Sequence, residues 1–385
     1  MKPNPKVLII GLADRTKDLA KQRTSLEEVE LLVATFGGEV FKVITQNASR
    51  GDRSTYLGSG KVQEIKELVE KKGLDIVVIN AHLKSSQLFA LKTIISPEDQ
   101  CTIWDRTQLI LQIFKKHAQT AEAKLQIKLA QLHHHGPELS GLGKSMSQQA
   151  GGIGTRGIGE TNTELMRRHW RREIKIVKGK LAKVSQNRRQ QMKHRKQSGI
   201  PTVAIIGYTN AGKTTLFNVL TRRENKVQDA LFVTLDSSVS KVYLKNVGKE
   251  IFISDTIGFI QDLPTKLVEA FKSTLMETIN ADLLLQVIDS SERNIGLRIN
   301  TVGKIVASLG LGAKPQIYVF NKADKLASSE KKKLHLQYCS KKHLFISAKD
   351  NLGVDNLLGM IESELLAQGL KRAKHLSYLN DLPTA

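Results

Sequence analysis

The feature that most constrains the fold is a strand, a glycine-rich loop and a helix in direct succession. The run TVAIIG (202–207) is apolar enough for a buried strand, and TTLFNVLTRR (214–223) has a helical pattern. Between them, Gly207–Thr214 spell G-x-x-x-x-G-K-T, and this flanking by strand and helix is what supports a phosphate-binding P-loop. A chance glycine-rich loop is the alternative, and the motifs downstream argue against it.

The residue types in this loop suit phosphate chemistry. Backbone N–H groups can surround phosphate oxygens only where the chain curls tightly, which Gly207 and Gly212 permit. Lys213 would bring a positive charge to the β- and γ-phosphates, and Thr214 is the expected Mg²⁺ ligand. The loop therefore predicts a nucleoside triphosphate site.

A second motif ends another expected strand. EIFISDTIGF (250–259) closes on Asp255-x-x-Gly258, a spacing that lets an aspartate reach the Mg²⁺ shell and a glycine N–H meet the γ-phosphate. The preceding SVSKVYLKNVGKE (238–250) predicts a hairpin. Phe259 takes the next position, where Ras-like enzymes carry the glutamine that orients the attacking water. Because a phenyl ring cannot position water, we expect slow intrinsic hydrolysis.

Two later motifs indicate guanine. PQIYVFNKAD delivers Asn321, Lys322 and Asp324 at the carboxyl end of a strand, where α/β sheets place ligands. Asp324 can accept hydrogen bonds from guanine N1–H and the exocyclic amine, whereas adenine would leave this carboxylate buried and unsatisfied. HLFISAKDN then presents residues 347–349, whose backbone N–H groups could contact guanine O6. Four motifs in this order predict a GTP-binding domain.

The N-terminal region predicts a small parallel sheet, because strand-like and helical patterns alternate. The strand-length apolar runs are KVLIIGL (6–12), GGEVFKVIT (37–45) and DIVVIN (75–80). The helical patterns between them are TSLEEVELLVATF, with Ser25 and Glu28 close to a capping box, and GKVQEIKELVEKKG, which ends at Gly73. YLGSGK (56–61) has glycines and a lysine but lacks P-loop spacing, so we interpret it as a turn that opens a helix.

The middle of the chain predicts an antiparallel pair of helices. TQLILQIFKKHAQTAEAKLQIKLAQL (107–132) has an amphipathic pattern with almost no breaker, so we expect one long helix ending near Gly136-Pro137. A second helical pattern, 164–198, carries 13 Lys/Arg and 2 Asp/Glu, a net charge of +11. A solvated helix face is the plain interpretation, and phosphate contact is the one that this concentration favours. His133–His135 point in different directions on a helix, which disfavours a shared metal ion.

Composition bounds the class of protein. The 385 residues suffice for two or three domains, and a net charge of +22 implies a polyanionic partner such as nucleic acid. The first apolar stretch is too short for a signal peptide and is soon broken by charge, and no run reaches the roughly 18 apolar residues of a membrane span, so we expect a cytoplasmic protein. Cys101 and Cys339 are too few for a disulfide framework, and we interpret both as reduced structural thiols.

Several of these motifs together resemble the HflX family of translation-factor-related GTPases. They are RSTYLGSGKVQEI, DRTQLILQIFKKHAQTAEAKLQIKLAQL, GGIGTRGIGE and GYTNAGKTTLFNVL…DALFVTLD…DTIGF, and the resemblance runs from about residue 50 to 366. It implies an N-terminal α/β domain, a helical hairpin and a Ras-like GTPase domain. It also implies binding to the large ribosomal subunit and its rRNA, linked to subunit dissociation and rescue of stalled ribosomes, with hydrolysis stimulated by a partner.

The resemblance adds two residues to the site. Thr234, in LFVTLDSS, would complete the Mg²⁺ shell with its hydroxyl and sense the γ-phosphate with its amide. Asn210 matches relatives in which this side chain helps hold a monovalent cation such as K⁺, although we favour simple hydrogen bonding within the loop. We assign catalysis to Lys213, Thr234 and Gly258, and the Mg²⁺ ligands to Thr214 and Thr234. The nucleotide-binding candidates are Gly207, Asn210, Ala211, Gly212, Lys213, Thr214, Thr215, Thr234, Asp255, Gly258, Asn321, Lys322, Asp324, Ser347, Ala348 and Lys349.

The chain departs from this family in two places. Relatives carry a proline-threonine pair after TLD, where this sequence has Ser237-Ser238, so the dynamics of this segment are expected to differ. Many relatives continue into a C-terminal domain, and we expect its contacts to be absent from a chain whose tail spans 369–385. The expected domains are 1–105 (α/β), 106–198 (helical hairpin) and 199–368 (GTPase), in a monomer.

The stretch GGIGTRGIGE raises a different possibility, because Gly152–Gly157 spell the dinucleotide fingerprint G-x-G-x-x-G. Polar residues rather than a strand precede it, and a basic helix follows, so we reject a Rossmann site. A flexible joint and a loop in which Arg156 approaches RNA remain as compatible interpretations. Two rival functions also remain: a GTPase of rRNA maturation or RNA modification, and a regulatory module that binds GTP with negligible turnover.

Overall fold

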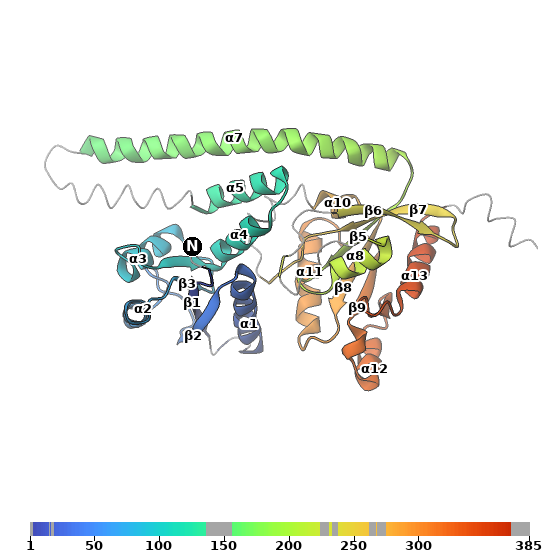
Figure 1. Cartoon of the computed structure of the whole chain (residues 1–385), viewed down its shortest axis with the longest axis horizontal. Coiled ribbons are helices and arrows are strands. Elements are labelled where there is room, and N and C mark those ends of the chain that lie inside the picture. The colour runs from blue at the N-terminus through green and yellow to red at the C-terminus, as the bar shows by residue number, and fades with distance from the viewer. Residues whose placement is uncertain are drawn as a thin grey trace, which may run out of the picture. The chain divides into compact units, whose positions relative to one another are not determined.

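A computed structural model of the chain describes residues 3–14, 16, 19–135, 156–223, 231–232, 238–261, 267 and 275–370. For residues 19, 135, 156–163, 187–189, 191, 193 and 196 it describes the backbone alone. The chain divides into two compact units (Figure 1), a first unit of residues 1–184 with 264–270 and a second unit of residues 185–263 with 271–385. Each unit is built around its own sheet, which confirms the α/β class.

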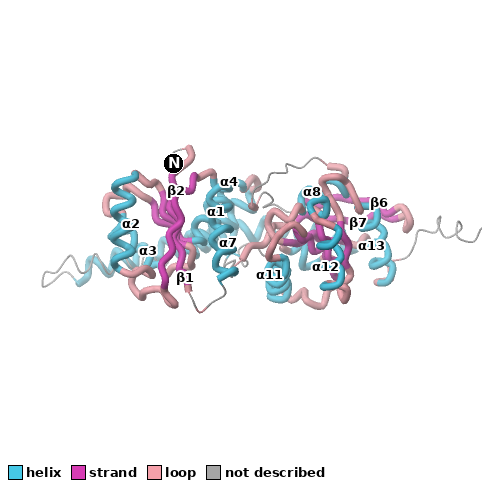
Figure 2. The backbone as a smooth tube through the Cα atoms, turned by 90° about the horizontal axis from the view of Figure 1, so that it is seen from below, coloured by secondary structure: helices cyan, strands magenta, loops and turns pink. Residues whose placement is uncertain are grey.

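The sheet of the first unit has four parallel strands in the order β2-β1-β3-β4. Figure 2 shows α2 and α3 on one side of these strands and α1 and α4 on the other. Three strands coincide with the predicted runs, and the short strand β4, TIWD, was not predicted. The strands are β1 (Lys6–Ala13), β2 (Glu39–Asn47), β3 (Ile76–Ile79) and β4 (Thr102–Asp105).

Helix α1 (Leu19–Phe36) corrects the predicted capping box. It begins six residues before Ser25, so Ser25 and Glu28 lie inside the helix rather than at its start. Glu28 is buried and forms an ion pair with Arg106, while Ser25 accepts a hydrogen bond from Asn80 Nδ2 at 3.0 Å. Tertiary contacts, not end capping, therefore explain these polar residues.

The next helices follow their sequence signals. Helix α2 (Ser59–Lys72) starts in the turn at YLGSGK and ends at Gly73, whose left-handed φ of +59° suits glycine. This confirms the interpretation of that stretch as the opening of a helix. Helix α3 (Ser85–Ile95) then leads into β4.

The predicted single helix over 107–132 is wrong, because the structure has two. Helix α4 (Arg106–His117) starts where the Asp105 carboxylate accepts a hydrogen bond from Gln108 N at 2.7 Å. Helix α5 (Ala121–His135) starts after Thr120, whose Oγ1 accepts from Ala123 N at 3.1 Å. A threonine cap of this kind can begin a new helix shortly after the previous one ends, without any glycine or proline between them.

Helix α7 (Arg156–Gln197) packs along α5 in the first unit, as the predicted antiparallel pair requires (Figure 1). Trp170 Nε1 donates to Leu132 O at 2.8 Å, and Lys128 Nζ lies 2.8 Å from Glu173 Oε2. Of the fingerprint GGIGTRGIGE, residues 151–155 lie outside the described residues. The rest is helical backbone, so its last two glycines belong to the first turns of α7.

The three consecutive histidines end α5. His134 Nε2 lies 3.1 Å from Asp105 Oδ1. Across the residues that the structure describes, no group of three or more His, Cys, Asp or Glu side chains is placed to hold a metal ion. Both cysteines are free thiols, and Cys101 is buried whereas Cys339 is exposed. The expected structural role therefore fits the buried Cys101, whereas the exposed Cys339 does not fit it.

The second unit has a six-stranded sheet in the order β10-β9-β8-β5-β7-β6, in which only β6 runs antiparallel. Pairing of β6 with β7 confirms the predicted hairpin. The strands are β5 (Thr202–Gly207), β6 (Ser238–Leu244), β7 (Lys249–Asp255), β8 (Leu283–Asp289), β9 (Gln316–Asn321) and β10 (His343–Phe345). The helices are α8 (Lys213–Thr221), α10 (Met276–Asn280), α11 (Ile295–Ser308), the short 3₁₀ helix η1 (Ala323–Lys325), α12 (Ser328–Gln337) and α13 (Val354–Ala367).

Buried apolar residues of the central strands, α8 and α13 form the core of this unit. The parallel strands β5, β7, β8 and β9 all end at one edge of the sheet, and the predicted motifs follow directly from three of these ends. Within the described part of the chain, no helix is long and apolar enough to cross a membrane.

Candidate nucleotide-binding site

The P-loop, Gly207–Thr214, has a backbone that demands its glycines. Gly207 and Gly212 have φ angles of +153° and +88°, values that other residues rarely adopt. A Cβ on Gly207 would lie 2.3 Å from Val287 O, and one on Gly212 would lie 2.2 Å from Asn321 Nδ2. Asn210 has a φ of +60°, which asparagine tolerates better than most residues. The loop is therefore wrapped tightly against the ends of β8 and β9.

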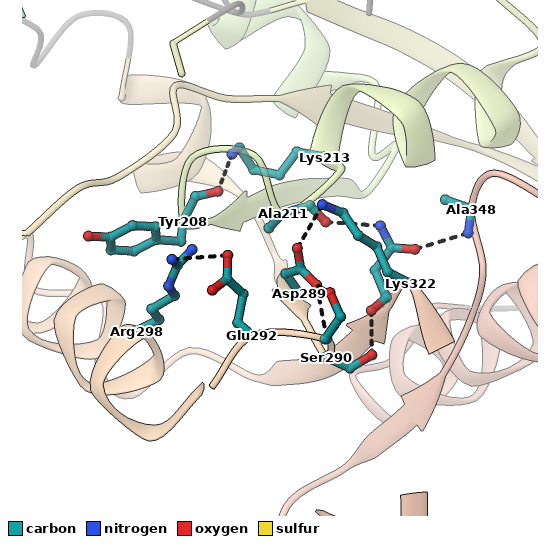
Figure 3. A network of polar contacts seen from close by, with 11 residues as sticks. Tyr208, Ala211, Lys213, Asp289, Ser290, Glu292, Arg298, Lys322 and Ala348 are labelled. Atoms are coloured by element: carbon teal, nitrogen blue, oxygen red, sulfur yellow. Dashed lines mark hydrogen bonds and ion pairs between the residues drawn. The ribbon is translucent and has the colours of Figure 1, made fainter. Parts of the chain in front are cut away.

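Lys213 begins α8 beneath this loop. Its Nζ is buried and donates to Tyr208 O at 2.7 Å (Figure 3). Burial lowers the pKa of Lys213 to about 8, and nearby Asp255 opposes this shift. A phosphate beside the loop would favour the charged form of this side chain. Thr215 follows in the first turn of α8.

Thr214 and Asp255 meet at the start of α8 and the end of β7. Thr214 Oγ1 donates to Asp255 Oδ2 at 2.8 Å, and Asp255 is fully buried. Hydroxyl and carboxylate oxygens are the hard ligands that Mg²⁺ prefers, and the pair lies at the helix N-terminus where phosphates bind. This donor set therefore fits a Mg²⁺ ion shared with nucleotide phosphates. Thr234, the other expected ligand, lies outside the described residues.

Gly258 approaches the P-loop closely. A Cβ at this position would lie 2.7 Å from Thr209 Cγ2 and 3.0 Å from Lys213 Nζ, so only glycine fits without displacement. The adjacent Phe259 is 1% exposed and packs in the core. Its phenyl ring is therefore shielded from solvent in this structure.

Asn321 connects two loops of the site, and Figure 3 labels its partners Ala211 and Ala348. Its Nδ2 donates to Ala211 O at 2.9 Å, and its Oδ1 accepts from Ala348 N at 3.0 Å. A single amide therefore ties the P-loop to the loop that follows β10. This contact is structural, whereas the sequence predicts only a role at the nucleotide for Asn321.

Asp289 and Ser290, at the end of β8, were missed in the sequence. Asp289 Oδ2 lies 2.7 Å from Lys322 Nζ, and Ser290 donates from both N and Oγ to Asn321 O, at 2.9 and 2.6 Å. Lys322 itself has a left-handed φ of +59°. These bonds hold the N-K-x-D turn against its neighbouring strand. The one sequence signal was their position directly after the apolar run LLLQVI.

Asp324 is exposed in this structure, whereas the motif predicts a buried carboxylate. The Ser347 hydroxyl hydrogen-bonds to it, and this bond holds the pKa of Asp324 below its usual value. Discrimination against adenine therefore requires the base itself to separate this carboxylate from water. The same Ser347 hydroxyl lies 2.8 Å from Asp350 Oδ2, so the two carboxylates share its one hydrogen.

The N–H groups after β10 are partly engaged within the protein. Ser347 N donates to Leu352 O at 3.0 Å, and Ala348 N donates to Asn321 Oδ1 at 3.0 Å. The expected contact with guanine O6 thus requires these amides to share their hydrogens or Lys349 N to supply one. All described candidates, from Gly207 to Lys349, gather at the carboxyl edge of one sheet.

Three family profiles match the chain. They are described as "GTP-binding GTPase N-terminal" over residues 23–115, "GTP-binding GTPase Middle Region" over 117–195 and "50S ribosome-binding GTPase" over 202–322. The third profile covers the P-loop, the D-x-x-G motif and Asn321-Lys322.

Known proteins match over most of the chain. "GTPase HflX" of Caldanaerobacter subterraneus subsp. tengcongensis is 43% identical over 344 residues, 89% of this chain and 78% of that protein. "GTPase HflX" of Escherichia coli K12 is 36% identical over 345 residues, 90% and 80% of the two chains. Among solved structures, the SsGBP–GDP complex is similar with a TM-score of 0.53 and 25% identity, covering 94% of this chain and 99% of that one.

Proposed function

This chain belongs to the HflX family of P-loop GTPases, and on that premise we propose that it hydrolyses GTP on the large ribosomal subunit and dissociates or rescues stalled ribosomes. The observation that carries the proposal is the match to the 50S ribosome-binding GTPase profile over 202–322. That span contains the P-loop, Asp255 and Asn321, which lie together at the carboxyl edge of the sheet.

The chain's own groups divide the work on GTP. P-loop amides and Lys213 hold the β- and γ-phosphates and offset the charge that develops during transfer. Thr214 and Thr234 would hold Mg²⁺, with Asp255 orienting Thr214 through their 2.8 Å hydrogen bond. When bound, the ion would neutralise phosphate charge. The Gly258 N–H meets the γ-phosphate, and Asp324 reads the guanine edge.

Partner stimulation follows from Phe259. Its ring is buried and has no hydrogen-bonding group to orient a water molecule. A water-positioning group must therefore come from elsewhere, which favours slow turnover of the protein alone and stimulation on the ribosome. Asn210 has a left-handed φ of +60°, a backbone conformation that asparagine tolerates better than most residues. We therefore favour a role of Asn210 in the shape of the loop over a role as a K⁺ ligand.

Helix α7 offers a surface for rRNA. Eight basic residues in its first-unit part are all exposed: Arg167, Arg168, Arg171, Arg172, Lys175, Lys178, Lys180 and Lys183. A group of Lys and Arg side chains in water binds phosphate backbones with little sequence preference and strong salt dependence. These residues, called the basic segment of α7, support an RNA-rich partner.

The test is GTP hydrolysis by the full chain with and without purified large subunits. We expect strong stimulation by subunits, little by free rRNA, and none in Lys213→Ala. Arg171→Ala/Arg172→Ala should raise the half-maximal subunit concentration by about tenfold through lost phosphate contacts. Lys332→Ala/Lys333→Ala, a pair on α12 of equal charge, serves as the matched control.

Two outcomes would overturn the proposal. Stimulation by precursor rRNA or tRNA rather than by subunits would favour a GTPase of rRNA maturation or RNA modification. Tight GTP binding without turnover under every condition would favour a regulatory module.

A further inference from the structure

Tyr208, the second residue of the P-loop, extends its ring away from Lys213 and beside Arg298 (Figure 3). The residue is 8% exposed, and its hydroxyl accepts a hydrogen bond from Gln261 N at 2.8 Å. Gln261 lies three residues after Gly258. One phenol therefore joins the start of the P-loop to the chain that leaves the D-x-x-G motif.

Two backbone bonds run beside this contact. Phe259 N donates to Gly207 O at 3.1 Å, and Thr209 N donates to Phe259 O at 2.8 Å. Together with the bond from Gln261, they fix the segment that follows Gly258 to consecutive residues of the P-loop. The two backbone bonds form with any side chains at these positions. The bond to the Tyr208 hydroxyl, in contrast, depends on the identity of residue 208.

Arg298 holds the Tyr208 ring from the side of α11 (Figure 3). Its guanidinium carbon lies 4.7 Å from the ring centroid, within the range of a cation–π contact. Glu292 fixes the guanidinium in turn, with 3.0 Å between Arg298 Nη2 and Glu292 Oε1. Arg298 and Glu292 thereby orient the phenol toward Gln261.

We propose that Tyr208 and Arg298 are positioning residues for γ-phosphate recognition, because they fix the chain that carries the Gly258 N–H. The role rests on the proposed contact between Gly258 and the γ-phosphate. GDP has no γ-phosphate, so loss of this support should weaken binding of a GTP analogue and leave GDP binding intact. A residue that only stabilised the fold would affect both nucleotides alike.

The experiment compares the affinities of the full chain for GDP and for the non-hydrolysable analogue GMPPNP. Tyr208→Phe keeps the ring and removes the hydroxyl. We expect its GMPPNP affinity to fall by about fivefold, the loss expected for one neutral hydrogen bond, with GDP affinity unchanged. Arg298→Met, which keeps the stem and removes the cation, should likewise lower the affinity for GMPPNP and leave the affinity for GDP unchanged. GTP turnover at saturating substrate should fall in both variants.

The controls are Tyr243→Phe, an exposed tyrosine on β6, and Arg293→Met, an exposed arginine beside Glu292. Both should bind the two nucleotides as the natural chain does. Equal losses for GDP and GMPPNP in Tyr208→Phe, or no loss for either, would overturn the positioning role. Gly258→Ala separates the premises: if it loses GMPPNP selectively while Tyr208→Phe does not, the γ-phosphate contact stands and the positioning role fails. If Gly258→Ala loses nothing, the contact itself is wrong.

Discussion

At the scale of single residues, the pKa of Lys213 predicts a proton uptake on nucleotide binding. Burial lowers this pKa to about 8, so a growing share of the free protein has a neutral lysine as the pH rises through this value. A bound phosphate favours the charged form, so binding must then take up a proton. We expect uptake of about 0.1 proton per GDP at pH 7 and about 0.9 at pH 9 for a pKa of about 8.

Calorimetric titration in two buffers of different ionisation enthalpy measures this uptake. Lys213→Ala, titrated at higher GDP concentration, should lose the difference between the two pH values. If proton uptake were equal at pH 7 and pH 9, or if Lys213→Ala kept the difference in uptake between the two pH values, the proton would belong to another group.

Asp324 predicts a change of base preference. Its carboxylate can accept two charge-assisted hydrogen bonds from guanine, and an amide in its place would set a donor against the guanine amine. Asp324→Asn should therefore weaken GDP binding by about 100-fold, the effect of losing one such bond. Xanthosine diphosphate, which carries a carbonyl in place of that amine, should regain affinity.

Equilibrium binding of both nucleotides checks this, with Asp350→Asn as the matched control. Asp350 shares the Ser347 hydroxyl with Asp324. Asp350→Asn therefore tests whether disturbing that hydroxyl is by itself enough to weaken GDP binding. If both variants lose GDP affinity equally, loop structure rather than base recognition explains the effect.

Much of the site followed from sequence because short motifs fix both backbone and chemistry. At Gly207 and Gly212, positive φ angles and close neighbouring atoms leave no room for a side chain. The G-x-x-x-x-G-K-T spacing of the two glycines made these positions recognisable in the sequence. Tyr208 and Asp289 were missed, because their partners, Gln261 and Lys322, become neighbours only when strands far apart in sequence pair.

At the scale of elements, the buried pair of α1 and α4 predicts a large loss of stability. The Arg106 side chain is 3% exposed, pairs with Glu28 and donates to Asn80 Oδ1 at 2.9 Å. Removing one partner leaves an uncompensated buried charge. Arg106→Met should therefore lower the free energy of unfolding of the first unit by about 3 kcal/mol.

Urea unfolding followed by tryptophan fluorescence measures this loss, because Trp104 and Trp170 both lie in the first unit. Arg23→Met breaks an ion pair with Glu27 in which the Arg23 side chain is 81% exposed, and it should cost less than about 0.5 kcal/mol. Adding Glu28→Leu to Arg106→Met should recover part of the loss. Similar small effects of both arginine variants would show that the buried pair contributes no more than a surface one.

The elements themselves were predicted unevenly, for physical reasons. Apolar strand runs such as 6–12 and 202–207 were correct, since burial on both faces leaves a continuous pattern. The break between α4 and α5 was missed because a single Thr120 cap carries no periodicity. Ser25 and Glu28 imitated a cap while serving a buried tertiary contact, which no local pattern can distinguish.

At the scale of the whole molecule, two separate cores predict two unfolding transitions. Each unit closes its own sheet, and the nucleotide site lies entirely in the second. A ligand that binds only folded protein stabilises the unit it binds, by about 2.7 kcal/mol at 100 times its Kd. For a unit of this size that corresponds to a rise in Tm of about 5–10 °C.

Thermal unfolding with two probes can separate the units. Circular dichroism at far-ultraviolet wavelengths reports helices and strands of both, whereas fluorescence of Trp104 and Trp170 reports the first alone. We expect GDP to move one dichroism transition upward and to leave the fluorescence transition in place. Asp324→Asn, with affinity about 100-fold lower, should cut the stabilisation at the same GDP concentration to about 0.4 kcal/mol, a rise in Tm of about 1 °C, without changing the fluorescence transition. If GDP moved both probes together, α7 would have to couple the two cores into one cooperative unit, because residues of this helix belong to both units.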